Sequence, residues 1–236
     1  MKSLKKFLLT TAMTMIVGTS AFAASGFEFI LNVPLGVGIG IPSKYFKDLG
    51  LKSRAGFDGG VTAQLGYMFQ VVDGFGVSVL GELGYAHSSY AIGGKFKQSG
   101  ADYEMSINQT LHSFQIGLLP KFNIGAFAIG IGGGVKIPVA GESVTKTKVT
   151  YEGRTVWDDT TKEKNIKKYI DPAVIGYIKG TFDYSIFFTD NLAFNIGLYL
   201  GGDLFPTPAG LFSSEKEIKS TFNIGVELGL KFGPKA

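Results

Sequence analysis

Two side chains near the middle of the chain have the types and spacing of a hydrolytic pair. His87 and Ser89 stand two residues apart in the run His-Ser-Ser-Tyr, and the only other histidine is His112. Serine becomes a nucleophile when an adjacent base takes its proton and an acid orients that base. Residues two apart on a strand share a face, but the sequence places no acid beside this pair. We therefore expect an interfacial histidine beside loop serines, with no catalytic residue.

Nine charged residues form a second candidate group. They recur at the polar positions of segments that otherwise alternate with apolar residues: Glu28, Glu82, Asp183, Asp203, Glu227, Lys121, Lys136, Lys179 and Lys231. Such charges could line a transport path or pair with one another. Because an unpaired buried charge is costly, we expect mutual pairing in a narrow interior.

We expect no metal or cofactor site. The chain has no cysteine, which excludes disulfides and thiolate metal ligands. The glycine-rich runs at 36–40 and 130–134 lack the strand–loop–helix setting and the lysine of a phosphate loop, so they are interpreted as small residues facing an interior.

Strict alternation identifies the elements that position these residues. From Thr221 to Phe232 every even residue is large and apolar, and every odd residue is polar, charged or glycine. A period of two indicates a strand with one apolar face. Seven earlier segments alternate in the same way, although Pro34 inside the first predicts a bulge. The eight expected strands are 27–41, 61–71, 75–87, 111–122, 127–139, 169–188, 192–200 and 221–232.

Connection lengths and the distribution of charge indicate a membrane barrel. Tight turns alternate with four polar loops at 42–57, 88–105, 141–168 and 205–220, as in barrels with short inner turns and long outer loops. The apolar faces carry almost no charge. Aromatic residues gather at the turn ends, as in an interfacial girdle, with Tyr85, Tyr90 and Tyr169 expected at the other end. The predicted fold is all-β, an eight-stranded antiparallel up-and-down transmembrane β-barrel; a soluble periplasmic β-protein is the alternative.

The N-terminus has the pattern of a cleaved signal peptide. Lys2, Lys5 and Lys6 precede a short apolar run that ends in Ala21-Phe22-Ala23. We expect a signal peptide at 1–23 and one barrel domain at 24–236. The net charge of +4 includes those three lysines, so the remainder is nearly neutral and no nucleic-acid partner is expected.

The whole pattern resembles the small outer-membrane β-barrels of the OmpA transmembrane-domain and OmpX type. The resemblance implies an outer-membrane location, contact with outer-membrane lipid, and a terminal aromatic read by the barrel-insertion machinery. Phe232 matches that aromatic, although Gly233–Ala236 follow it. His87 and Ser89 also resemble the His-x-Ser motif of lipid A deacylases, with Tyr90 where that family has asparagine.

Function is expected to reside in the outer loops. The longest, 141–168, holds charges of both signs and the single tryptophan, Trp157. We predict strands extending beyond the membrane, a hairpin tip at Glu152-Gly153-Arg154, and a surface or host ligand bound there. The leading hypothesis is a structural or surface-interaction protein. The alternatives are a lipid A-modifying enzyme that uses His87 and Ser89, and a conduit for small apolar molecules that opens near Pro34.

Overall fold

The computed structural model describes residues 25–165, 174–207 and 217–236. The predicted signal peptide at 1–23 lies outside the described residues, as does Tyr169. The elements are β1 (Gly26–Ile41), α2 (Lys44–Asp48), β2 (Lys52–Val72), β3 (Phe75–Gln98), β4 (Ala101–Leu118), β5 (Lys121–Ile124), β6 (Phe127–Tyr151), β7 (Arg154–Glu163), β8 (Ile175–Thr189), β9 (Leu192–Thr207) and β10 (Glu217–Phe232). Among these residues, no helix is long and apolar enough to cross a membrane.

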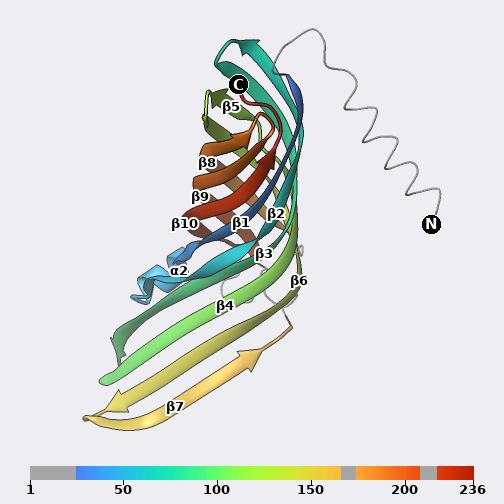
Figure 1. The fold of residues 1–236 in the computed structure, drawn as a ribbon. Helices are drawn as coiled ribbons and strands as arrows, with labels where there is room; N and C mark the ends of the chain where they lie inside the picture. Colours follow the sequence, from blue (N-terminus) through green and yellow to red (C-terminus); the bar gives the residue numbers. More distant parts are fainter. Residues whose placement is uncertain (1–24, 166–173, 208–216) are drawn as a thin grey trace, which may run out of the picture.

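The strands close into a ring of eight positions. Each is antiparallel to its neighbours in the order β1, β2, β3, β4 with β5, β6, β8, β9 and β10, and β10 pairs with β1 to close the ring. Within one position β5 continues β4 after Leu119 and Pro120. β7 lies outside the ring and pairs only with β6 among the described strands. The predicted eight-stranded up-and-down barrel is confirmed (Figure 1).

The two ends of the barrel differ as expected. At one end, short turns join β2 to β3, β5 to β6, and β8 to β9, and the C-terminus lies at this end (Figure 1). At the other end the strands run on as long hairpins. Two of these turn at Ser99-Gly100 and Glu152-Gly153, where all four residues have positive φ, as a tight type I′ turn requires. The predicted tip at Glu152 is confirmed.

Two segments that we expected to be loops are regular structure. The segment 88–105 is the outer part of the β3–β4 hairpin, paired from Ser88 with Leu111 to Gln98 with Ala101. The segment 42–57 contains α2 and the start of β2. Residues 88–92 of β3 are buried on both faces of the strand, so polar and apolar residues do not alternate there as they do on a strand with one solvated face.

The bulge expected at Pro34 is absent. Between β1 and β2, Asn32 pairs with Thr62 and Leu35 with Gly59, so the register is unchanged across Pro34 although the pairing is interrupted. The irregularity lies one strand away, between β2 and β3 at Arg54 to Gly59. The proline therefore costs ladder hydrogen bonds without shifting the strand.

Candidate functional site

The barrel interior is a set of buried ion pairs. Lys121 Nζ lies 2.8 Å from Asp183 Oδ2, and Lys136 Nζ lies 2.7 Å from Asp203 Oδ2. Lys231 Nζ lies 2.7 Å from Glu28 Oε1. These six side chains point inward because they occupy the polar phase of their strands. The expectation of mutual pairing is confirmed for them.

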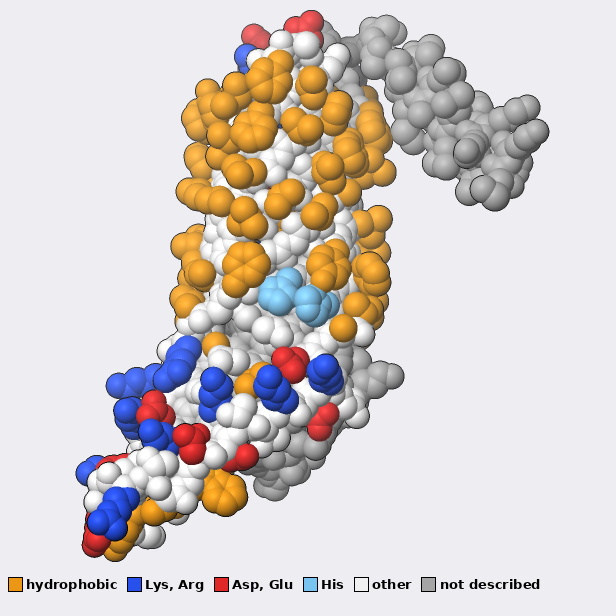
Figure 2. Space-filling view, turned by 60° about the horizontal axis from the view of Figure 1, so that its bottom comes forward, with side chains coloured by type: hydrophobic (Ala, Val, Ile, Leu, Met, Phe, Trp, Pro, Cys, Tyr) orange, Lys and Arg blue, Asp and Glu red, His pale blue; other side chains and the backbone are white. Residues whose placement is uncertain are grey.

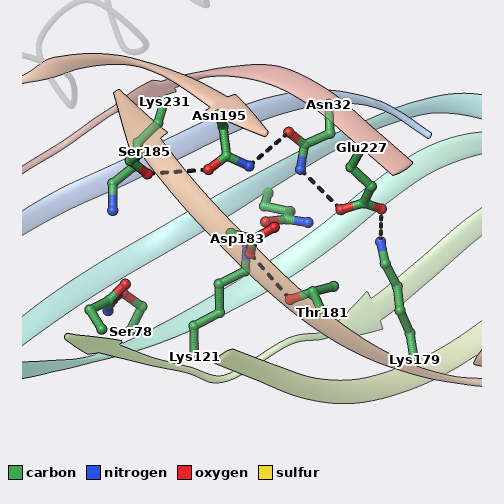
Figure 3. Close-up of polar contacts among 12 residues, drawn as sticks. Asn32, Ser78, Lys121, Lys179, Thr181, Asp183, Ser185, Asn195, Glu227 and Lys231 are labelled. Carbon is green, nitrogen blue, oxygen red and sulfur yellow. Dashed lines mark hydrogen bonds and ion pairs between the residues drawn. The ribbon is translucent and has the colours of Figure 1, made fainter. Parts of the chain in front are cut away.

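Lys179 on β8 joins the remaining two carboxylates. Its Nζ lies 2.5 Å from Glu227 Oε1 on β10 (Figure 3). The same Nζ lies 3.0 Å from Glu82 Oε2 on β3, so one cation spans the barrel. Glu82 also accepts hydrogen bonds from Gln64 Nε2, Gln115 Nε2 and Tyr177 Oη. Among the described side chains, Glu227 accepts one further hydrogen bond, from Asn32 Nδ2 at 3.4 Å. The two carboxylates therefore depend on Lys179 to different degrees.

Neutral groups extend this network toward the end with the short turns. Ser185 Oγ donates to Asn195 Oδ1 at 3.2 Å, and Asn195 Nδ2 donates to Asn32 Oδ1 at 3.5 Å (Figure 3). Asn32 in turn donates to Glu227. Residues from β1, β8, β9 and β10 are thus tied together across the interior, which satisfies polar groups that would otherwise be buried without partners.

Little free volume remains inside. A polar cavity of about 60 Å³ lies among Asp58, Lys136, Lys179, Asp203 and Glu227, room for roughly two water molecules. At the outer end α2 covers the barrel, because Phe46 packs with four buried apolar residues: Leu51, Tyr90, Ile92 and Ile107. Tyr90 is 2% exposed, so its expected place in an outer aromatic girdle is wrong.

Two buried interior charges were missed in the sequence. Asp58 accepts hydrogen bonds from Ser89 N at 2.7 Å and Ser89 Oγ at 3.0 Å. Lys219 is buried, with its Nζ 5.5 Å from the Tyr90 ring centroid. Both fell in or beside segments that we expected to be loops. Extending the alternation backward from Thr62 and from Thr221 places both on the inward phase, and that signal was available.

From the sequence we expected His87 beside serines in a loop, with no acid placed next to them. In the structure Ser89 lies on β3, and an aspartate contacts it. His87 is half-buried on the outward phase of β3, beside the Phe57 ring at 5.9 Å. Ser89 is 6% exposed, and its Oγ donates to Phe57 O at 2.9 Å or Asp58 Oδ1 at 3.0 Å. An acid thus contacts the serine directly, and no hydrogen bond joins His87 to Ser89 among the described contacts. The serine hydroxyl is engaged with β2 and is not presented on the outer surface.

The outer surface of the ring is a continuous apolar belt. Figure 2 shows apolar side chains over the visible face of the barrel wall, with charged ones gathered on the hairpins beyond it and a few at the opposite tip. Ile131, at the middle of the belt on β6, is 69% exposed. None of the eight phenylalanines expected in the girdle at the turn ends is buried: Phe27, Phe69, Phe75, Phe122, Phe127, Phe188, Phe194 and Phe232. An apolar exterior around a charged interior is stable in lipid and not in water.

The chain is an eight-stranded transmembrane β-barrel. No family model matches its sequence, and no curated protein matches it. Its fold is similar to solved outer-membrane structures at low identity. The attachment invasion locus protein Ail of Yersinia pestis covers 86% of this chain and 97% of its own, at 10% identity and TM-score 0.33.

Two further solved structures are similar to the barrel. Neisserial surface protein A covers 89% of this chain and 98% of its own, at 11% identity and TM-score 0.32. OprG of Pseudomonas aeruginosa covers 89% and 96%, at 14% identity and TM-score 0.30. The architecture rests on this chain's own closed ring and apolar belt, and the resemblance to small outer-membrane barrels is confirmed for the fold.

Beyond the belt, β6 and β7 form a second long hairpin beside that of β3 and β4. They pair from Ser143 with Glu163 to Tyr151 with Arg154, and β6 also pairs with β4 as far as Thr150. Together with the outer part of β3 this makes a four-stranded sheet that projects past the barrel wall (Figure 1). The predicted extension of strands beyond the membrane is confirmed. Trp157 on β7 is 57% exposed.

Among the described residues, no group of three or more His, Asp or Glu side chains is arranged to hold a metal ion. The chemistry that the described side chains support in the interior is therefore ion pairing and hydrogen bonding.

Proposed function

We propose that this barrel is a surface-interaction protein whose binding element is the projecting sheet, with β7 as its contact edge. The observation that carries the proposal is the position of β7, which has one pairing partner, β6, among the described strands. Its other edge presents backbone N–H and C=O groups to solvent, and such an edge is a template for an added strand.

The side chains of β7 support the same proposal. Every residue from Arg154 to Lys162 is exposed, including Val156 at 60% and Trp157 at 57%. Exposed apolar side chains on a free edge give an incoming strand apolar contact in addition to backbone hydrogen bonds. Lys148 pairs with Asp158 in register, so charges of both signs flank these contacts. The partner that fits is an extended segment of another protein.

The interior supports an interaction protein more than a transporter. Four lysines are paired with five carboxylates, and eight strands leave an interior that side chains can fill. We also propose that β10 presents the signal for barrel insertion, because Phe232 is its last residue and lies exposed beside Phe29, with ring centroids 6.1 Å apart. No catalytic role is proposed for His87 and Ser89.

A peptide-display selection on the purified barrel in lipid nanodiscs tests the surface proposal. We expect the enriched peptides to have β-branched or aromatic residues at every second position, as an added strand would. These peptides should lose binding when Glu142–Lys167 is replaced by a short Gly/Ser turn. Trp157→Ala should weaken them at least threefold, whereas Phe96→Ala, on the neighbouring hairpin, should not. Peptides that bind the shortened barrel equally well would overturn the proposal.

A further inference from the structure

The two histidines of the chain, 25 positions apart in sequence, meet on the outside of the barrel. His87 on β3 lies directly opposite His112 on β4, and their ring centroids are 4.8 Å apart. Both side chains are half-buried. Figure 2 shows the pair at the border between the apolar belt and the charged hairpins. The proposed surface function uses neither residue.

The separation of the two rings fits a shared metal ion. A divalent ion bonded to both imidazoles at about 2.0–2.1 Å, with a nitrogen–metal–nitrogen angle near 90–109°, places the ring centroids roughly 4.5–5.2 Å apart. The observed 4.8 Å falls inside this range, and the rings are tilted by 55° and not stacked face to face.

Tyr85 supplies the outer support that metal-bound histidines usually have. Its Oη lies 2.5 Å from His112 Nδ1, which leaves Nε2 as the free nitrogen. When Nδ1 carries the proton and donates to Tyr85, Nε2 presents its lone pair for coordination. On the other side the Phe57 ring lies 5.9 Å from the His87 ring, centroid to centroid.

A local irregularity of the sheet lies at the same place. The β4–β6 register shifts between His112 and Ser113, where Val139 is the extra residue of β6. Such bulges bend a strand and re-aim its side chains, and they are over-represented beside functional sites. This feature is independent of the ring distance.

We propose that His87 and His112 form a two-histidine site for a borderline divalent transition cation, Cu²⁺ or Zn²⁺, with Tyr85 as a positioning residue. Imidazole nitrogen selects these ions over Mg²⁺ and Ca²⁺, and Cu²⁺ is expected to bind more tightly than Zn²⁺. The two protein ligands leave the remaining coordination positions open to water.

The test uses full-chain protein without a histidine tag, folded in detergent micelles and checked by heat-modifiable gel mobility. We expect one Cu²⁺ per barrel by calorimetry, and an electron paramagnetic resonance spectrum with coupling to two imidazole nitrogens. His87→Ala and His112→Ala should each weaken binding at least tenfold. Zn²⁺ should shift the ring NMR signals of both histidines, whereas Ca²⁺ should shift neither.

Two variants separate the site from general effects. Tyr85→Phe should weaken Cu²⁺ binding several-fold and keep the two-nitrogen spectrum, because it removes a support and not a ligand. Ile116→Ala, on the same outward face of β4 and four residues from His112, should change nothing. The proposal is overturned if wild-type protein binds no Cu²⁺ saturably at 100 µM probe concentration, or if the double variant His87→Ala with His112→Ala binds it equally well.

Discussion

Replacing Lys179 with methionine removes the cation that spans the barrel and leaves two buried carboxylates without it. Glu82 keeps three neutral donors, Gln64, Gln115 and Tyr177, at 2.8–3.0 Å. Glu227 keeps only the 3.4 Å bond from Asn32. Breaking one side of a buried pair costs roughly 3–5 kcal/mol, and the unequal donors place most of that cost on Glu227. We expect Lys179→Met to lower the free energy of unfolding by that amount.

The unequal donors also predict which second change restores stability. Glu227→Gln added to Lys179→Met should recover more than half of the loss, because it removes the poorly supported charge. Glu82→Gln should recover less, since Glu82 is solvated by its three donors. Lys162→Met, on the exposed hairpin, is the matched control and should change stability by less than about 0.5 kcal/mol.

Urea unfolding in lipid vesicles, followed by gel mobility, measures these differences. Trp157 fluorescence is unsuitable, because that residue lies on the projecting hairpin and not in the barrel. The reasoning is refuted if Lys179→Met behaves like the control, or if Glu82→Gln rescues it better than Glu227→Gln.

Four further outcomes are expected. Ile131→Arg, at mid-belt, should cost about 2–4 kcal/mol in the same assay, and a harmless effect would contradict the outward assignment. Gly132→Ala should destabilise the barrel because its Cβ would lie 2.1 Å from Leu118 O, whereas Gly176→Ala, with nothing within 4 Å, should not; equal effects would contradict the packing. Replacing Glu142–Lys167 with a Gly/Ser turn should leave the barrel folded and heat-modifiable, and failure to assemble would place that segment in the fold. Purified barrel should give no large, steady conductance in planar bilayers, and porin-sized channels would contradict the filled interior.

The sequence predicted which face of a strand each charged side chain lies on better than it predicted which other side chain it contacts. The inward position of Lys179 follows from local alternation, which a strand imposes on successive residues. Its bond to Glu82 joins residues 97 positions apart, and no local pattern encodes such a pairing. Nine of the interior charges could therefore be named in advance, but Asp58 and Lys219 could not be named from the expected strand limits, nor could the cation that serves two carboxylates.

The outer part of the molecule was less predictable for a different reason. The segment 88–98 is part of a regular strand, yet its buried and exposed residues do not alternate along the sequence. The burial of Ser89 depends on the β2–β3 irregularity near Gly59 and on contacts with Phe57 and Asp58. These are tertiary features, and the His-x-Ser spacing alone could not reveal them.

Cysteine labelling on whole cells tests the central claim most directly, because the chain contains no cysteine of its own. Single variants would place one thiol on the hairpin (Trp157→Cys), one on the belt (Ile131→Cys) and one in the β8–β9 turn (Asp190→Cys). With a membrane-impermeant maleimide, an outer-membrane barrel in the proposed orientation predicts labelling of Trp157→Cys on intact cells. Asp190→Cys should react only after the envelope is permeabilised, and Ile131→Cys only after the protein is unfolded. Labelling of Asp190→Cys from outside, or equal labelling of all three positions in the folded protein, would contradict the account.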